Sequence, residues 1–143
     1  MSTSSRIGAP SRRDALVVDL LRQALPGLVA VYRFGSSVTG AVRPGSDVDV
    51  AILPHRRLDT LARFDLQERL AAALLSDVDL VDLRAASTVM ASQVITTSLL
   101  LYEGDTAARH VFEDFVYGRY ARLNEERRGI LDRIAAEGTV YGG

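Results

Sequence analysis

Two aspartates, one residue apart on an apolar strand, are the feature that most constrains this chain. Asp47 and Asp49 follow a strand-like segment at 28–34 and the pair Gly35-Ser36. Side chains alternate along a strand, so both carboxylates project from one face while the apolar residues between and after them point to the other. At roughly 4 Å two such charges repel by about 1 kcal/mol in water and about 4 kcal/mol at an effective dielectric near 20. A hard divalent cation such as magnesium offsets that repulsion best.

The Gly-Ser pair supplies the second half of a metal-nucleotide site. Gly35 lets the backbone approach a ligand closely, and the N–H groups of Ser36 and Ser37 can open a short helix that faces phosphate oxygens. Each part alone is also typical of an ordinary loop or a capped turn. The order of strand, Gly-Ser, ten residues and Asp-x-Asp strand favours the metal-nucleotide interpretation.

These residues resemble the signature of a known superfamily. Gly35-Ser36, ten intervening residues and Asp47-Val48-Asp49 are similar to the motif of the nucleotidyltransferases related to DNA polymerase beta. Within it the chain resembles the minimal nucleotidyltransferases, including the antitoxins of two-gene pairs whose partner is a HEPN-domain toxin of the HepT type. The resemblance runs from about residue 15 to 120. It implies an α/β (α+β) nucleotidyltransferase fold: a small mixed β-sheet flanked by helices, with a C-terminal helical extension.

Members of the superfamily need a third carboxylate on a neighbouring strand. The segment SDVDLVDL at 76–83 offers three candidates. Similarity to the family's strand favours Asp79. Asp77 as a strand-entry residue and Asp82 as a strand-exit residue, each with solvent as its partner, remain the alternatives.

The resemblance also implies a chemistry. Two magnesium ions held by Asp47, Asp49 and Asp79 would bridge the triphosphate of ATP, polarise its alpha-phosphate and stabilise the departing pyrophosphate. Asp79 would help to activate the acceptor hydroxyl.

The remaining expected site residues bind the nucleotide. Ser36, with the backbone of Gly35 and Ser37, would hold the terminal phosphates. Arg43 precedes Asp47 by four residues and could neutralise developing phosphate charge, although a plain surface arginine is an equal interpretation.

The possible acceptors of the AMP group are ranked by the chain's resemblance to family members. The antitoxin relatives transfer AMP to a tyrosine of their HEPN-family toxin, which predicts a hetero-oligomer with a cognate toxin as partner. The alternatives are adenylylation of a small-molecule hydroxyl, as in antibiotic-modifying relatives, and an antitoxin that acts by binding alone. The toxin-type Arg-x4-His-x-Tyr motif is absent around both His55 and His110.

Composition narrows the function classes. The 143 residues, 48% hydrophobic, suffice for one core, and a net charge of −1 gives no electrostatic case for direct nucleic-acid binding. All 17 basic residues are arginine, which excludes lysine chemistry, and the lack of cysteine excludes disulfides and thiolate ligands. No stretch is typical of a signal peptide or a membrane span, so we expect a cytoplasmic protein.

The predicted elements alternate between helix and strand. We expect a disordered segment at 1–10, a catalytic core at 11–104 and a helical extension at 105–143. Periodicity and capping residues predict helices at 11–25, 59–75, 88–97 and 105–137, and strands at 28–34, 47–53, 76–83 and 99–102. The segment at 105–137 is either one long helix or two helices divided near Gly118 or Gly129. Leu16 and Leu61 are placed on the core-facing stripes of their helices. The apolar stripe after Leu123 is suited equally to self-packing and to a partner.

Overall fold

The computed structural model describes residues 11–35 and 48–140, the side chains as far as 137. Four strands form one mixed sheet in the order β3-β2-β1-β4: β3 Val78–Asp82, β2 Val48–Leu53, β1 Ala30–Phe34 and β4 Leu99–Glu103. β1 is antiparallel to both β2 and β4, whereas β2 and β3 are parallel. The predicted mixed sheet flanked by helices is confirmed. The expected disordered segment at 1–10 and the short helix after Gly35 lie outside the described residues.

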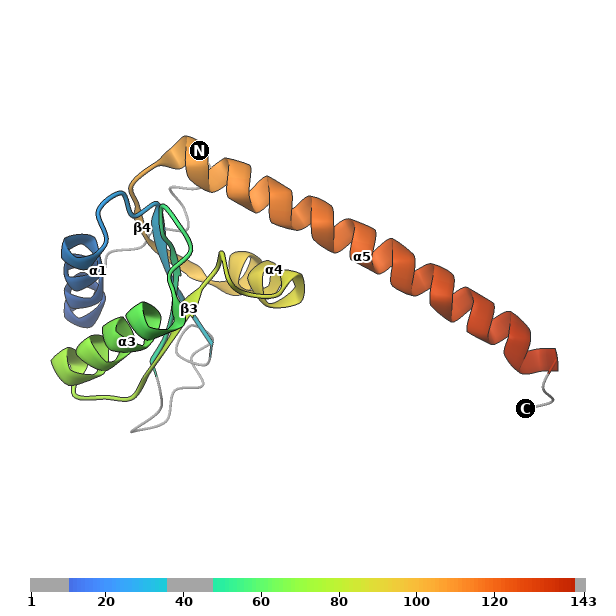
Figure 1. Cartoon of the computed structure of the whole chain (residues 1–143), viewed down its shortest axis with the longest axis horizontal. Helices are drawn as coiled ribbons and strands as arrows, with labels where there is room; N and C mark the ends of the chain where they lie inside the picture. Colours follow the sequence, from blue (N-terminus) through green and yellow to red (C-terminus); the bar gives the residue numbers. More distant parts are fainter. Residues whose placement is uncertain (1–10, 36–47, 141–143) are drawn as a thin grey trace.

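Two helices cover each face of the sheet (Figure 1). α1 (Arg12–Ala24) and α3 (Thr60–Leu74) lie on one face, and α4 (Thr88–Thr97) and the first part of α5 (Thr106–Val140) lie on the other. Alternation along β2 serves both sides, since Val50 and Ile52 pack under α1 and α3 while Ala51 and Leu53 join the α4 and α5 core. Each face of the central strand β2 is therefore buried in its own hydrophobic cluster.

Side-chain caps start three of the helices at the predicted places. Ser11 forms a capping box with Asp14 at the start of α1, and Asp59 and Ser87 accept backbone N–H groups at the starts of α3 and α4. Leu75 ends α3 in the left-handed conformation with φ 55°. Caps satisfy N–H groups that the first helical turn leaves without partners, which is why sequence alone placed these starts well.

Some predicted core residues are wrong. Leu61 on α3 is 80% exposed and Leu16 on α1 is 44% exposed, whereas Leu66 and Leu70 carry the contact of α3 with the sheet. Asp82 was expected to face solvent if it was not a ligand, yet it is 3% exposed. The predicted apolar stripes thus included residues that no other element covers, because helical periodicity does not show how far the neighbouring elements extend.

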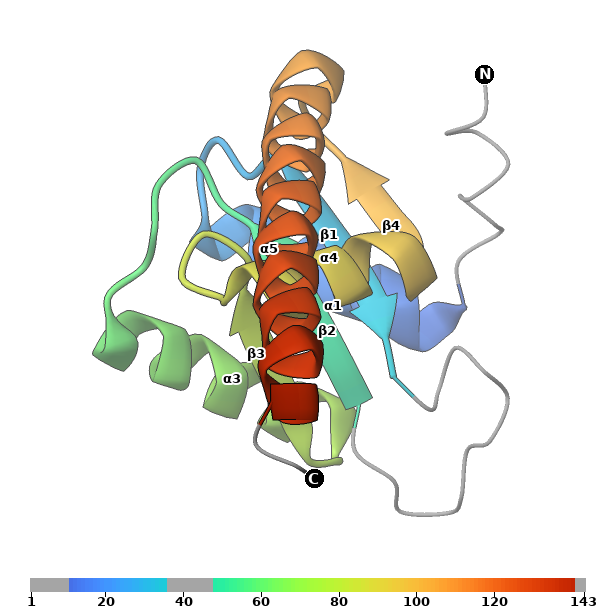
Figure 2. The same cartoon turned by 90° about the vertical axis from the view of Figure 1, so that its right-hand side faces the viewer.

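α5 is one unbroken helix of 35 residues, about 52 Å long at 1.5 Å per residue. It continues through Gly118 and Gly129, and its far part extends away from the rest of the molecule (Figures 1 and 2). Val116 is buried in the core, whereas all residues from 125 to 137 are exposed, including the apolar Ile130 and Ile134. The far stripe therefore does not pack on its own chain. No helix in the described part of the chain has the length and apolarity needed to cross a membrane.

Candidate active site

The candidate site lies where β1 ends and β2 and β3 begin. β2 and β3 run parallel with Asp49 and Asp79 directly opposite each other, so their Cα atoms are roughly 4.8 Å apart. Neighbouring residues in register project from the same face of a sheet. Ala51 and Val81, two residues further along each strand, belong to the α4 and α5 side, which places both carboxylates on that side. The structure thus brings Asp49 and Asp79 together at one end of the sheet.

Both carboxylates are accessible from outside the core. Asp49 is half-buried and Asp79 is exposed, although each lies next to a buried valine or leucine on its own strand. Oxygen ligands at adjacent strand positions that can be reached by solvent can share a hard cation and still leave coordination positions to a nucleotide.

Gly35 closes the site from the side of β1. Phe34 is the β1 partner of Asp49, and Gly35 follows it with φ +82°, a conformation that L side chains rarely adopt. A Cβ built on Gly35 would lie 2.1 Å from Oδ2 of Asp49. The Asp49 carboxylate therefore occupies the space that any side chain at position 35 would need. Glycine is required there both for its backbone conformation and for this close approach.

The other two strand-segment aspartates are placed differently. Asp77 precedes β3, and its main-chain oxygen accepts the N–H of Val48 at 2.9 Å. Asp82 lies at the opposite end of β3, where its carboxylate accepts the backbone N–H groups of Leu58 at 2.8 Å and Arg84 at 2.9 Å. Asp82 thus fastens the loops after β2 and β3, and the expectation of a solvent partner for it is wrong.

Four predicted site residues lie outside the described residues: Asp47, Ser36, Ser37 and Arg43. Within residues 11–35 and 48–137, no group of three or more His, Asp or Glu side chains gathers with the geometry of a metal site. The described part of the site consists of Gly35, Asp49 and Asp79.

A buried polar cluster lies between the sheet and α5, on the side that α4 and α5 cover. The sequence analysis did not predict it. Arg109 on α5 is fully buried and pairs with Glu103 at the end of β4 and with Glu113 one turn further along α5, at 2.7 Å. The Tyr32 hydroxyl on β1 donates to the same Glu113 at 2.8 Å. The cluster ties the first turns of α5 to β1 and β4. Its one local signal is the i,i+4 spacing of Arg109 and Glu113, which on an average helix marks an exposed pair.

The charges in this cluster stabilise one another. Burial alone would lower the pKa of Arg109, but hydrogen bonds to Glu103 and Glu113 outweigh it and the pKa is raised. Burial alone would likewise raise the pKa of Glu103, yet hydrogen bonds from Arg109 and Thr106 lower it. Burial and the Glu113 carboxylate raise the pKa of Tyr32, which keeps its hydroxyl a donor. Arg109 and Tyr32 therefore stay protonated, and Glu103 stays ionised, near neutral pH.

Comparison with known proteins gives consistent matches. Residues 18–107 match the family model described as polymerase beta, nucleotidyltransferase. The protein adenylyltransferase MntA of Shewanella oneidensis is 42% identical over 120 residues, which cover 84% of this chain and 86% of that protein.

Two solved structures extend these matches to the fold. A crystal structure of a toxin-antitoxin with AMP-PNP contains a chain that superposes with a TM-score of 0.76 at 40% identity, over 85% of this chain and 98% of that one. A structure of the tri-AMPylated Shewanella oneidensis HEPN toxin in complex with MNT antitoxin gives a TM-score of 0.71 at 38% identity, over 86% and 96%. The matched region thus covers nearly the whole length of both of these chains.

Proposed function

Because the chain belongs to the polymerase beta nucleotidyltransferase family, we propose that it is an antitoxin that transfers AMP from ATP to a tyrosine of a cognate HEPN-family toxin. The observation that carries this proposal is the similarity to MntA, which extends over 84% of the chain at 42% identity. The match to a chain of the complex between MNT antitoxin and tri-AMPylated HEPN toxin supports a toxin as the acceptor. AMPylation would neutralise the toxin, and the two proteins would form a hetero-oligomer.

The placement of Asp49 and Asp79 supports a role for both as magnesium ligands, together with Asp47. The two described carboxylates lie in register on adjacent strands, and both present oxygen donors outside the core. Their mutual repulsion disfavours leaving them together without a cation. This donor set fits Mg²⁺, which would supply polarisation of the alpha-phosphate and charge stabilisation for the leaving pyrophosphate. We expect two such ions, as in the family the chain resembles.

The protein groups would bind and orient the reactants. Ser36, with the backbone of Gly35 and Ser37, would hold the terminal phosphates of ATP, and Arg43 would add positive charge. In the transfer, the acceptor hydroxyl oxygen forms a bond to the alpha-phosphorus while the bond to the pyrophosphate oxygen breaks. Asp79 would take the hydroxyl proton. The exposure of Asp79 leaves room for an acceptor that arrives on the surface of another protein.

A labelling experiment tests the proposal. Purified protein, its HEPN-family partner, Mg²⁺ and alpha-labelled ATP should give label on a partner tyrosine, identified by mass spectrometry. Asp49→Asn and Asp79→Asn should each lose the transfer, because each removes a charged ligand. Asp65→Asn, on an exposed position of α3, is the matched control and should retain it.

The outcomes separate the alternatives. Transfer to the partner that survives in Asp49→Asn would refute the assignment of the site. A partner that is bound and inhibited without label would show an antitoxin that acts by binding alone. Label that appears on small hydroxyl compounds and not on the partner would assign the chain to the small-molecule adenylyltransferases.

A further inference from the structure

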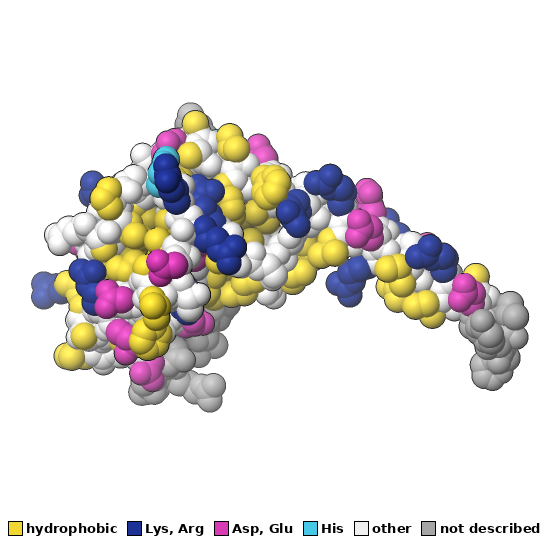
Figure 3. Space-filling view, viewed as in Figure 1, with side chains coloured by type: hydrophobic (Ala, Val, Ile, Leu, Met, Phe, Trp, Pro, Cys, Tyr) yellow, Lys and Arg dark blue, Asp and Glu magenta, His cyan; other side chains and the backbone are white. Residues whose placement is uncertain are grey.

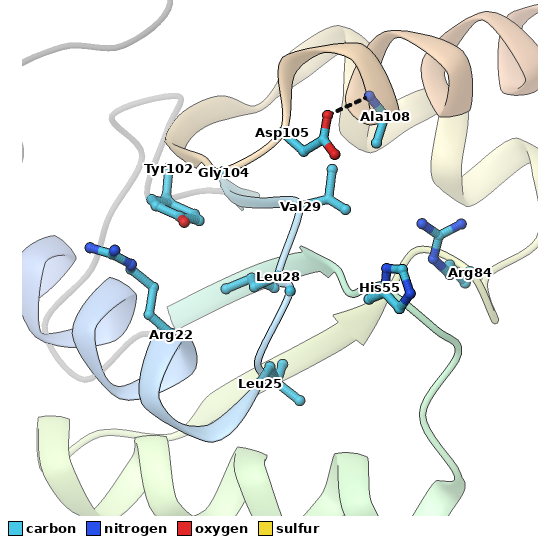
Figure 4. Close-up of a pocket in the computed structure, with 11 residues that line it drawn as sticks. Arg22, Leu25, Leu28, Val29, His55, Arg84, Tyr102, Gly104, Asp105 and Ala108 are labelled. Carbon is cyan, nitrogen blue, oxygen red and sulfur yellow. Dashed lines mark hydrogen bonds between the residues drawn. The ribbon is translucent and has the colours of Figure 1, made fainter.

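A cavity of about 540 Å³ lies at the end of the sheet away from Asp49 and Asp79. It is formed by the last turn of α1, the loops after β2 and β3, and the turn that joins β4 to α5 (Figure 4). Its wall includes Val29, just before β1, whereas Asp49 is paired with Phe34 at the last residue of that strand. The cavity is therefore separate from the nucleotidyl-transfer site. Its volume lies within the range typical of small-molecule sites.

Basic side chains from three separate elements line this cavity. Arg22 comes from α1, His55 from the loop after β2 and Arg84 from the loop after β3 (Figure 4). Asp105 is the one acidic residue in its described lining, and its carboxylate accepts the N–H of Ala108 at 2.9 Å as the cap of α5. Arginine side chains also gather beside an apolar hollow on this face of the globular body (Figure 3). The cavity thus carries an excess of positive charge.

Arg84 is anchored by a hydrogen bond to the protein, and the exposed Arg22 contacts an aromatic ring. The Nε atom of Arg84 donates to the Pro54 carbonyl at 2.6 Å, and its guanidinium lies 5.6 Å from the centre of the Phe112 ring. The Arg22 guanidinium lies 4.9 Å from the centre of the Tyr102 ring. Among the described residues, none accepts a hydrogen bond from the terminal nitrogens of either guanidinium. Donors positioned in advance lose less conformational entropy when a ligand binds.

We propose that this cavity is a second ligand site, which binds a small molecule with two or more phosphate groups. The forked donors of an arginine match phosphate oxygens in a bidentate way, and two arginines on opposite sides of one cavity suit a ligand with separated anionic groups. Inorganic pyrophosphate and a nucleoside diphosphate share this chemistry. The Tyr102 ring and the apolar wall at Leu25 and Leu28 offer additional contact area to a nucleoside.

Binding of inorganic pyrophosphate and of adenosine diphosphate can be measured by isothermal titration calorimetry on the full chain. Chelator is included, so that a metal-dependent transfer site does not contribute. The wild-type protein should show saturable binding, and Arg22→Gln and Arg84→Gln should each weaken it about tenfold or more. Asp49→Asn, in the other site, and Arg69→Gln, an exposed arginine on α3, are the controls and should bind like the wild type.

The comparison of ligands identifies the source of the phosphates. Tighter binding of the diphosphate nucleotide supports a nucleotide site, and equal binding supports a site for inorganic polyphosphate. Circular dichroism shows whether Arg84→Gln is folded, since this arginine also holds the Pro54 loop. Arg22 lies on the surface of α1, so its variant decides the matter if Arg84→Gln fails to fold. No saturable binding in the wild type, or unchanged affinity in Arg22→Gln, would overturn the proposal.

Discussion

Replacing Arg109 with methionine should destabilise the protein strongly, because this arginine is the one cation in the buried cluster under α5. It is 0% exposed and pairs with both Glu103 and Glu113, and Tyr32 donates to the second of these carboxylates. Removing one partner of a buried ion pair costs about 3–5 kcal/mol, because the other charge stays buried without compensation. Glu103 retains some contact with water, so the lower end, about 3 kcal/mol, is expected. For a chain of this length that is a fall in Tm of about 10 °C.

The loss should depend on pH with a definite sign. The pKa of Glu103 is lowered in the folded protein, so its contribution is present above the unfolded value near 4.3 and is lost as the pH falls through the folded value. In the methionine variant Glu103 loses its cation, so the stabilisation that its charge gives the wild type is absent at every pH. The gap in Tm between wild type and Arg109→Met should therefore be widest above about pH 5.5 and should narrow as the pH falls below about 4.

Thermal unfolding followed by circular dichroism at pH 7.5 and pH 3.5 measures this gap. Arg128→Met, on an exposed position of the same helix, is the matched control and should change Tm little at either pH. A gap of equal size at the two pH values would refute the electrostatic reasoning. It would show that Arg109 contributes through packing of its aliphatic stem alone.

Four further substitutions have definite expected outcomes. Gly35→Ala should abolish AMP transfer in the labelling assay, because the new Cβ would meet the Asp49 carboxylate at 2.1 Å in a backbone conformation unfavourable to alanine. Gly118→Ala is the control, since a Cβ there meets nothing within 4 Å. It should retain activity, and its free energy of unfolding in denaturant should rise by up to about 1 kcal/mol. Asp82→Ala should cost about 2 kcal/mol or more in the same unfolding measurement, because two backbone N–H groups lose their acceptor, and a stability within 0.5 kcal/mol of wild type would contradict this. Tyr32→Phe should cost only about 1 kcal/mol, since Glu113 keeps its bond to arginine, and a loss as large as that of the methionine variant would show the hydroxyl to be essential to the cluster.

Much of the local structure could be predicted because its determinants lie within a few residues of each other. The predicted caps at Ser11 and Ser87 placed two helix starts, a third helix was expected from about Asp59, and Pro54 correctly closed the Asp-x-Asp strand. Glycine at position 35 was predicted to let the backbone approach a ligand, whereas the structure shows the Asp49 carboxylate in the space that a Cβ would need. Hydrogen bonds within one helical turn and the steric freedom of glycine are properties of short peptides, so sequence reveals them directly.

Residues on different strands were harder to relate. Asp77, Asp79 and Asp82 lie within six positions, and spacing alone could not choose among them. The parallel register of β2 and β3 sets Asp79 opposite Asp49 and turns Asp82 into a buried acceptor for two loops. Which residue of one strand faces which residue of another depends on pairing between segments that are far apart in the chain, and no local pattern encodes it.

By itself, then, the sequence determined the order of helices and strands, the turn at Gly35 and the Asp-x-Asp pattern on which the family assignment depends. The tertiary structure alone decided that Asp79 lies beside Asp49, that Arg109 is the buried anchor of α5, and that the far stripe of this helix stays exposed. Local patterns state which side of an element is apolar. They do not state what covers it, because burial depends on all the neighbours that the folded chain brings together.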